Sequence, residues 1–109
     1  MEAAEITDQL DDDHKLRDAV VTLLIHSGIA SSDVICCKRL GEYHVGDDHS
    51  AAATLLARVD KDLAEQLRRL LSMKTKAAYS GAPSGADDLK TARRAAQKLL
   101  EAAQQHART

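Results

Sequence analysis

Aromatic residues are almost missing from this sequence: among 109 residues there is no Phe and no Trp, and the only two Tyr are Tyr43 and Tyr79. Strands usually carry many β-branched and aromatic residues, so the shortage disfavours a β fold. It also disfavours binding of single-stranded nucleic acid by base stacking on aromatic rings. Alanine, in contrast, occurs 19 times. It favours closely packed helices because it combines the highest helix propensity with a small side chain.

Cysteines and long apolar runs are also scarce. The only two cysteines, Cys36 and Cys37, are adjacent, which suits neither zinc ligands nor a relaxed disulfide. We therefore expect both to be small buried hydrophobes in a reducing compartment. The longest apolar run (19–25, interrupted once) is far shorter than a bilayer span, so no membrane association is expected. Glu2 and Glu5 stand where a signal peptide would be basic, which predicts a cytoplasmic protein.

The length and composition predict one all-α domain, an up-and-down bundle of four to five helices. Residues 1–12 form an acidic lead-in or a short helix (Ala3–Leu10), and residues 13–109 form the single bundle domain. The acidic run Asp11–Asp13 is typical of a helix amino end, where the macrodipole favours negative charge. A long helix is therefore predicted from Asp13 to Leu40, with apolar positions on more than one face.

Glycine, proline and capping residues divide the rest of the chain into three further helices. Gly41 is typical of a carboxyl cap, and the loop 80–85 contains the only proline. Within the first helix, Gly28, Ser31 and Ser32 are weak helix formers that predict a kink. The predicted helices run from Asp48 or Ser50 to about Ala57, from Asp60 to about Tyr79, and from Ala86 to about Gln105.

The two parts of the chain carry opposite charge. Residues 1–60 contain 5 basic and 12 acidic side chains, whereas residues 61–109 contain 10 basic and 5 acidic ones. The favoured interpretation is that the parts attract each other within a monomer or across a dimer. A basic face for nucleic acid or an acidic partner is the alternative, although Arg93 and Arg94 are better explained as a solvated face.

Residue patterns for catalysis or metal binding are weak. His44, Asp48 and His49 could bind a divalent metal in a loop, but capping and solvation are the favoured explanation, and no metal site or cofactor is predicted. His26 lies in an apolar stretch and is expected to be a core histidine. No Ser-centred triad or glycine-rich phosphate loop occurs in the sequence.

One segment carries a family resemblance: the pattern Lys74-x4-Tyr79, followed by the loop 80–85 and an amphipathic helix over 86–105. In this order the chain resembles the HEPN superfamily of small prokaryotic helical bundles. Members commonly end their third long helix with a basic residue, four further residues and then His or Tyr. The resemblance extends as architecture over about residues 15–105.

The resemblance implies a homodimer and, in active members, a metal-independent ribonuclease with Arg and His in a cleft at the dimer interface. Here Lys74 replaces the Arg and Tyr79 replaces the His. Lysine neutralises phosphate only as a point charge, and tyrosine titrates near pH 10, too high for a base at neutral pH. Lys74, Tyr79 and Asp33 remain the candidates for a catalytic role, and Lys76 and Arg69 join Lys74 and Tyr79 as candidates for binding nucleotide or RNA.

Three hypotheses follow for function. The leading one is a non-catalytic HEPN-like homodimer that binds a nucleotide, RNA or a partner protein near Lys74 and Tyr79. The second is a metal-independent ribonuclease toxin of a toxin–antitoxin pair. The third is a structural or protein-interaction bundle, in which the stem of Lys74 packs with its amine in solvent and the ring of Tyr79 closes the bundle end.

Overall fold

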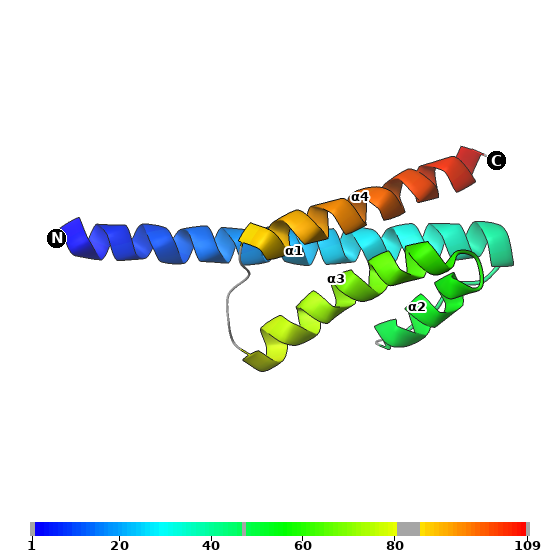
Figure 1. Ribbon diagram of the computed structural model, residues 1–109, viewed down its shortest axis with the longest axis horizontal. Coiled ribbons are helices and arrows are strands. Elements are labelled where there is room, and N and C mark those ends of the chain that lie inside the picture. Colours follow the sequence, from blue (N-terminus) through cyan, green and yellow to red (C-terminus); the bar gives the residue numbers. More distant parts are fainter. Residues whose placement is uncertain (1, 47, 81–85, 109) are drawn as a thin grey trace.

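The computed structural model describes the backbone of residues 2–46, 48–80 and 86–108, and the side chains of residues 15–46, 48–73 and 87–108. This part of the chain forms four helices and no strand, which confirms the predicted all-α bundle. The helices are α1 (Glu2–Leu40), α2 (His49–Ala57), α3 (Lys61–Ser80) and α4 (Ala86–Arg108). The three long helices alternate in direction, so α1 and α4 run side by side in the same sense, while the short α2 runs in the sense of α1 (Figure 1).

Helix α1 is continuous, whereas the sequence suggested a boundary at Asp11–Asp13. An aspartate inside a helix costs less than about 1 kcal/mol relative to alanine. Residues 2–27 contain no proline or glycine that would break the helix. The acidic run therefore lies within α1, and the expected lead-in is its amino-terminal part.

The amino-terminal part of α1 extends beyond the other helices (Figure 1). The molecule measures 58 × 27 × 20 Å and has a radius of gyration of 16.1 Å. A compact domain of this length would have a radius of gyration of about 13 Å. The excess reflects the projecting part of α1.

The core is built from small and aliphatic side chains contributed by all four helices. On α3, Leu67 and Leu70 are fully buried. On α4, Arg93 and Arg94 are exposed, in keeping with the solvated face expected for them, and Leu100 is exposed as well. The buried apolar residues are Val21, Ile25, Ile35, Cys36, Ala52, Ala53, Leu56, Ala64, Leu67, Leu70, Ala92, Ala95, Ala96, Leu99 and Ala103.

Gly28 is a packing position, and α1 passes through it without a break. A Cβ at this residue would overlap Cδ1 of Leu70 on α3 and would lie 3.3 Å from Cδ1 of Leu99 on α4. The absent side chain lets three helices approach one another. The structure therefore gives Gly28 a role in close packing, not the predicted kink.

The predicted helix caps are confirmed at the end of α1 and at the start of α2. Gly41 has a φ of 73° and its N–H donates to the carbonyl oxygen of Cys37 at 3.0 Å. The Asp48 carboxylate caps α2 by accepting from the N–H groups of Ser50 and Ala51.

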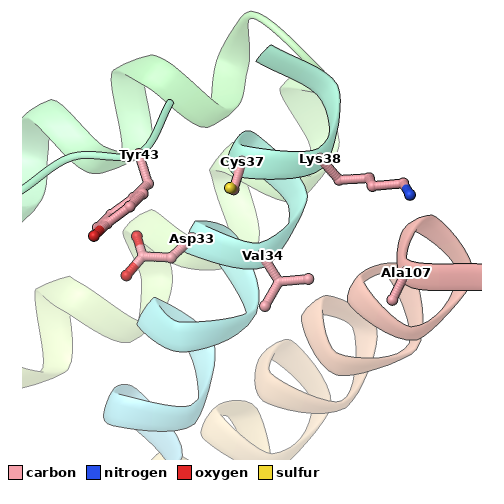
Figure 2. Close-up of a pocket in the computed structure, with 6 residues that line it drawn as sticks. All are labelled: Asp33, Val34, Cys37, Lys38, Tyr43 and Ala107. Atoms are coloured by element: carbon pink, nitrogen blue, oxygen red, sulfur yellow. The ribbon is translucent and has the colours of Figure 1, made fainter. Parts of the chain in front are cut away.

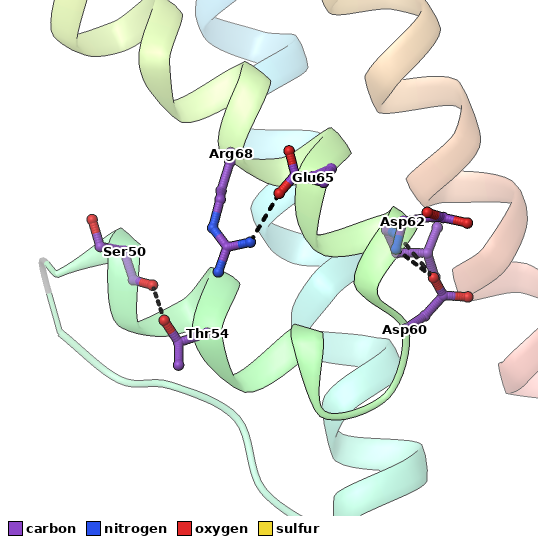
Figure 3. A network of polar contacts seen from close by, with 7 residues as sticks. Ser50, Thr54, Asp60, Asp62, Glu65 and Arg68 are labelled. Carbon is purple, nitrogen blue, oxygen red and sulfur yellow. Dashed lines mark hydrogen bonds and ion pairs between the residues drawn. The ribbon is translucent and has the colours of Figure 1, made fainter.

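At the start of α3, the Asp60 carboxylate accepts from the N–H groups of Asp62 at 2.8 Å and Leu63 at 3.1 Å (Figure 3). Arg68 and Glu65, also on α3, form an exposed ion pair at 3.2 Å. Exposed pairs of this kind contribute little. The caps, more than the surface ion pairs, fix where α2 and α3 begin.

Two further expectations about α1 are wrong. His26 is exposed and not a core residue, and Cys37 is exposed while its neighbour Cys36 is buried. Both errors have one cause: α1 is apolar on two faces, and the other helices cover only one of them.

By length and hydropathy alone, the segment Lys15–Leu40 could also cross a membrane, which the run length did not suggest. Its Val21, Ile25 and Ile35 nevertheless pack in the protein core, as in the central helix of a bundle.

Candidate functional site

A shallow pocket of about 620 Å³ lies where the carboxyl-terminal part of α1, the following loop and the end of α4 meet. Figure 2 shows the side chains that line it. They are Asp33, Val34, Cys37, Lys38, Tyr43 and Ala107. The pocket thus combines apolar walls with one carboxylate, one amine, one thiol and one phenol.

The sequence brings these groups together through helical spacing and one turn. Asp33 and Cys37 are four residues apart on α1, so they lie on the same face. Gly41 then ends the helix with a positive φ, and the chain turns back so that Tyr43 lies beside Asp33 (Figure 2). Glycine adopts this conformation without the strain that a Cβ would add. Gly41 therefore positions the aromatic wall of the pocket.

The loop is held to α2 by one exposed ion pair. Arg58, at the carboxyl cap of α2, contacts Glu42 at 3.2 Å, and both side chains are more than half exposed. A pair of this kind contributes at most about 1 kcal/mol. It orients the residue before Tyr43 but is too weak to fix the loop by itself.

Asp33 is the carboxylate that lines the pocket, and it is partly buried. Burial raises the pKa of its carboxyl, and the charges of nearby His44 and His49 lower that pKa in part. Lys38 extends from the opposite side of α1, toward the end of α4 (Figure 2). The pocket therefore has an acidic side near Tyr43 and a basic rim near Ala107.

The predicted weak metal candidates have other surroundings. Asp48 uses its carboxylate as the cap of α2, while His44 and His49 lie near Asp33. The Nε2 atom of His44 is buried and has no hydrogen-bond partner among the described residues. Within the described ranges, no three metal-binding side chains come together.

The predicted nucleotide-binding residues belong to another part of the molecule. Arg69 is exposed on α3, and the side chains of Lys74, Lys76 and Tyr79 lie outside the described residues. The carboxyl-terminal end of α3 is far from the carboxyl-terminal part of α1 (Figure 1). The structure therefore does not bring Asp33 to the Lys74-x4-Tyr79 segment; it brings Asp33 to Tyr43.

Cys37, Lys38 and Tyr43 were not predicted as site residues. The sequence contained one usable signal: Gly41 was recognised as a helix end, and Tyr43 follows it by two residues. The contribution of Ala107 could not be predicted, because it depends on α1 and α4 running in the same direction.

The two cysteines differ chemically as well as in exposure. Burial raises the pKa of the Cys36 thiol, an effect that the nearby Ser32 hydroxyl partly offsets. A raised pKa keeps a thiol protonated and unreactive. Cys36 is thus a structural core residue, whereas Cys37 presents its thiol at the pocket.

Comparison of the chain with protein-family models, curated proteins and solved structures found no match.

Proposed function

We propose that this chain is a non-catalytic binding protein: a HEPN-like helical bundle that works as a homodimer and takes a partner molecule in the pocket between Asp33 and Tyr43. The observation that carries the proposal is the pocket itself, with its apolar walls and a few converging polar groups. This combination is typical of binding sites. The family resemblance supplies the homodimer.

The pocket favours binding over catalysis. Asp33 is its one carboxylate, and the described residues place no histidine in its lining. Acid–base catalysis most often uses a histidine, and hydrolysis by carboxylates alone commonly uses a pair of them. The ribonuclease alternative would instead depend on Lys74 and Tyr79.

A nucleotide is the ligand class that we favour for this pocket. The exposed ring of Tyr43 offers a surface on which a base can stack, and Asp33 can accept a hydrogen bond from a base N–H. Lys38 at the rim supplies positive charge for a phosphate. The three groups line a single pocket.

The proposal is tested by thermal unfolding of the protein with a panel of nucleotides, because a ligand that binds only the folded state raises the apparent stability. We expect one nucleotide class to raise the melting temperature of the wild type. Tyr43→Ala and Asp33→Asn should abolish the rise, while Tyr79→Phe should retain it. Loss of the shift in Tyr79→Phe alone would place the site at the end of α3 instead.

The ribonuclease alternative has its own test. A toxin should arrest growth when overexpressed and should cleave RNA without added metal, and Lys74→Ala should remove both effects. We expect neither growth arrest nor cleavage from the wild type. Metal-independent cleavage that depends on Lys74 would contradict the non-catalytic proposal.

A further inference from the structure

Helix α1 carries a second apolar stripe, on the side opposite the core. Its residues step by alternating intervals of four and three, which is the heptad spacing of a helix that packs against another helix. Leu16 and Leu23 are 65% and 66% exposed, and Val34 is 44% exposed. We call this set the outer stripe: Leu16, Val20, Leu23, Ser27, Ala30, Val34 and Cys37.

The outer stripe and the core face lie on opposite sides of α1. The core face of α1 carries Val21, Ile25 and Ile35, which are at most 4% exposed. These residues alternate along the chain with those of the outer stripe, so the helical turn directs the two sets to different sides. A surface helix of a monomer has one apolar face and one polar face. Among the described residues, the outer stripe is mostly exposed, with only Val20 and Ser27 half-buried, so most of this apolar face is not covered by the other helices.

The outer stripe borders a groove of about 340 Å³ between α1 and α4. Small side chains line most of it, and Leu100 of α4, 40% exposed, lies along it. Val34 and Ala107 also line the pocket near Asp33, so groove and pocket are continuous. The residues that line the groove are Ser27, Ala30, Ser31, Val34, Leu100, Ala103, Gln104 and Ala107.

We propose that the outer stripe is the dimer interface, and that it packs antiparallel against the outer stripe of a second copy. This inference rests on the homodimer in the proposed function and adds the face and orientation. Val34 and Cys37 belong both to the outer stripe and to the pocket lining, so the pocket lies at the edge of the proposed interface. A twofold axis between Ser27 and Ala30 sets Leu23 opposite Val34 of the second copy. The same axis sets Val20 opposite Cys37 of the second copy, so large side chains flank a centre of small ones, where the helices approach closely.

Charge selects the antiparallel orientation. Twelve of the protein's 17 acidic residues lie in residues 1–60, and six of these lie in residues 2–13. Lys38 and Arg39 lie in the last turn of α1, and Arg108 ends α4 beside it. A parallel pair would bring the two acidic amino ends together, whereas an antiparallel pair separates them and extends each past Lys38 and Arg39 of the other copy, toward the loop that also carries Glu42 and Asp48.

The length of the outer stripe suits a stable interface. From Leu16 to Cys37 it spans about 32 Å at a rise of about 1.5 Å per residue. A contact of that length and one helix wide, about 10 Å, covers on the order of 300 Å² on each copy. The two copies together thus bury about 600 Å² along the stripes, and the groove on α4 adds to this area, toward the roughly 1,000 Å² that is the lower limit for a specific interface.

The first test is sedimentation equilibrium of the intact chain and of two variants matched in chemistry. Val34→Glu places a carboxylate in the outer stripe, and Val45→Glu places one in the loop, where Val45 is 76% exposed. We expect Val34→Glu to weaken dimerisation on the order of 100-fold, since it buries an unpaired charge, and Val45→Glu to leave it unchanged. Circular dichroism checks that both variants remain helical.

The outcomes separate this inference from the proposed function. A wild-type dimer that Val34→Glu and Leu23→Glu leave intact would overturn the outer stripe while preserving the homodimer. A wild-type monomer at every concentration would overturn both. A monomer that floats with phospholipid vesicles through Leu23 and Val34 would assign the outer stripe to a membrane and also overturn the inference.

The second test concerns orientation and uses cysteine cross-linking under mild oxidation. Val20→Cys should cross-link efficiently to the native Cys37 of the second copy, because the antiparallel register sets these residues opposite each other. Thr22→Cys, exposed but outside the outer stripe, is the control and should not cross-link. Efficient cross-linking of the wild type through Cys37 alone would show a parallel pair and overturn the proposed orientation.

Salt offers an independent check on orientation. Attraction between acidic and basic ends is screened as ionic strength rises. The antiparallel dimer should therefore dissociate more readily at 0.5 M than at 0.05 M salt, values that span about 4 to 14 Å in Debye length. Association that strengthens with salt would indicate neighbouring acidic ends and contradict the antiparallel orientation.

Discussion

Gly28 of α1 and Leu70 of α3 are in direct contact, and the Cδ1 atom of Leu70 occupies the space where a side chain at position 28 would begin. Leu70 is fully buried, so its methyl group cannot move into solvent to make room. Leu99 of α4 lies against the same point. The crossing of three helices therefore depends on a residue that is intrinsically unfavourable inside a helix.

The contact predicts that Gly28→Ala destabilises the fold. Alanine gains about 1 kcal/mol of helix propensity over glycine, but overpacking a core costs about 1–3 kcal/mol. We expect a net loss of about 1 kcal/mol in the free energy of unfolding, measured by urea denaturation, and a larger loss for Gly28→Val. In a Leu70→Ala background, Gly28→Ala should instead be neutral or stabilising, and equal losses in both backgrounds would contradict the contact.

Substitution of Gly41 should lower the free energy of unfolding for a different reason. Its φ of 73° is a conformation that a Cβ makes costly, although no atom lies within 4 Å of the space that the Cβ would take. Gly41→Ala should therefore lower the free energy of unfolding by about 1 kcal/mol through backbone strain alone. Gly41→Asn should recover part of this loss, because asparagine tolerates the left-handed region. Equal losses for Ala and Asn would argue against that cause.

Removal of the Asp60 cap should destabilise α3. Asp60→Ala leaves the N–H groups of Asp62 and Leu63 without their acceptor, which should cost about 0.5–2 kcal/mol in thermal or urea unfolding. Asp60→Asn keeps a side-chain oxygen and should lose much less. Asp62→Ala is the control for the loss of a negative charge, because Asp62 lies in the first turn of α3 but its side chain makes no capping bond.

The pKa of Asp33 predicts a pH-dependent stability. Burial raises this pKa in the folded state, so between the unfolded value near 3.8 and the raised value the folded state binds more protons than the unfolded state. The contribution of Asp33 therefore becomes less favourable as pH rises through that window. The melting temperature of the wild type, relative to Asp33→Asn, should fall as pH rises from 3 to 7. A difference that stays constant with pH would contradict the burial of Asp33.

The local features of the fold were predictable from the sequence, but its arrangement was not. The helix ends at Asp48, Asp60 and Gly41 could be predicted because capping depends only on neighbouring backbone groups. The continuity of α1 through its acidic run was missed, since no local signal distinguishes an aspartate at a helix start from one in a projecting helix.

The candidate site was harder to predict than the fold. Asp33 was a candidate site residue from the sequence, whereas the positions of Tyr43 and Ala107 in the same pocket depend on the turn after α1 and on the direction of α4. The exposure of Cys37 and Val34 followed from the same arrangement. Helix periodicity reports that a face is apolar; it does not report whether this chain or another molecule covers it.

Self-association is the central claim of this account, and sedimentation equilibrium across micromolar concentrations measures it directly. We expect a mass twice that of the 11.8 kDa chain for the wild type and a shift toward the single-chain mass for Val34→Glu. A wild type that stays at the single-chain mass over the whole range would contradict it.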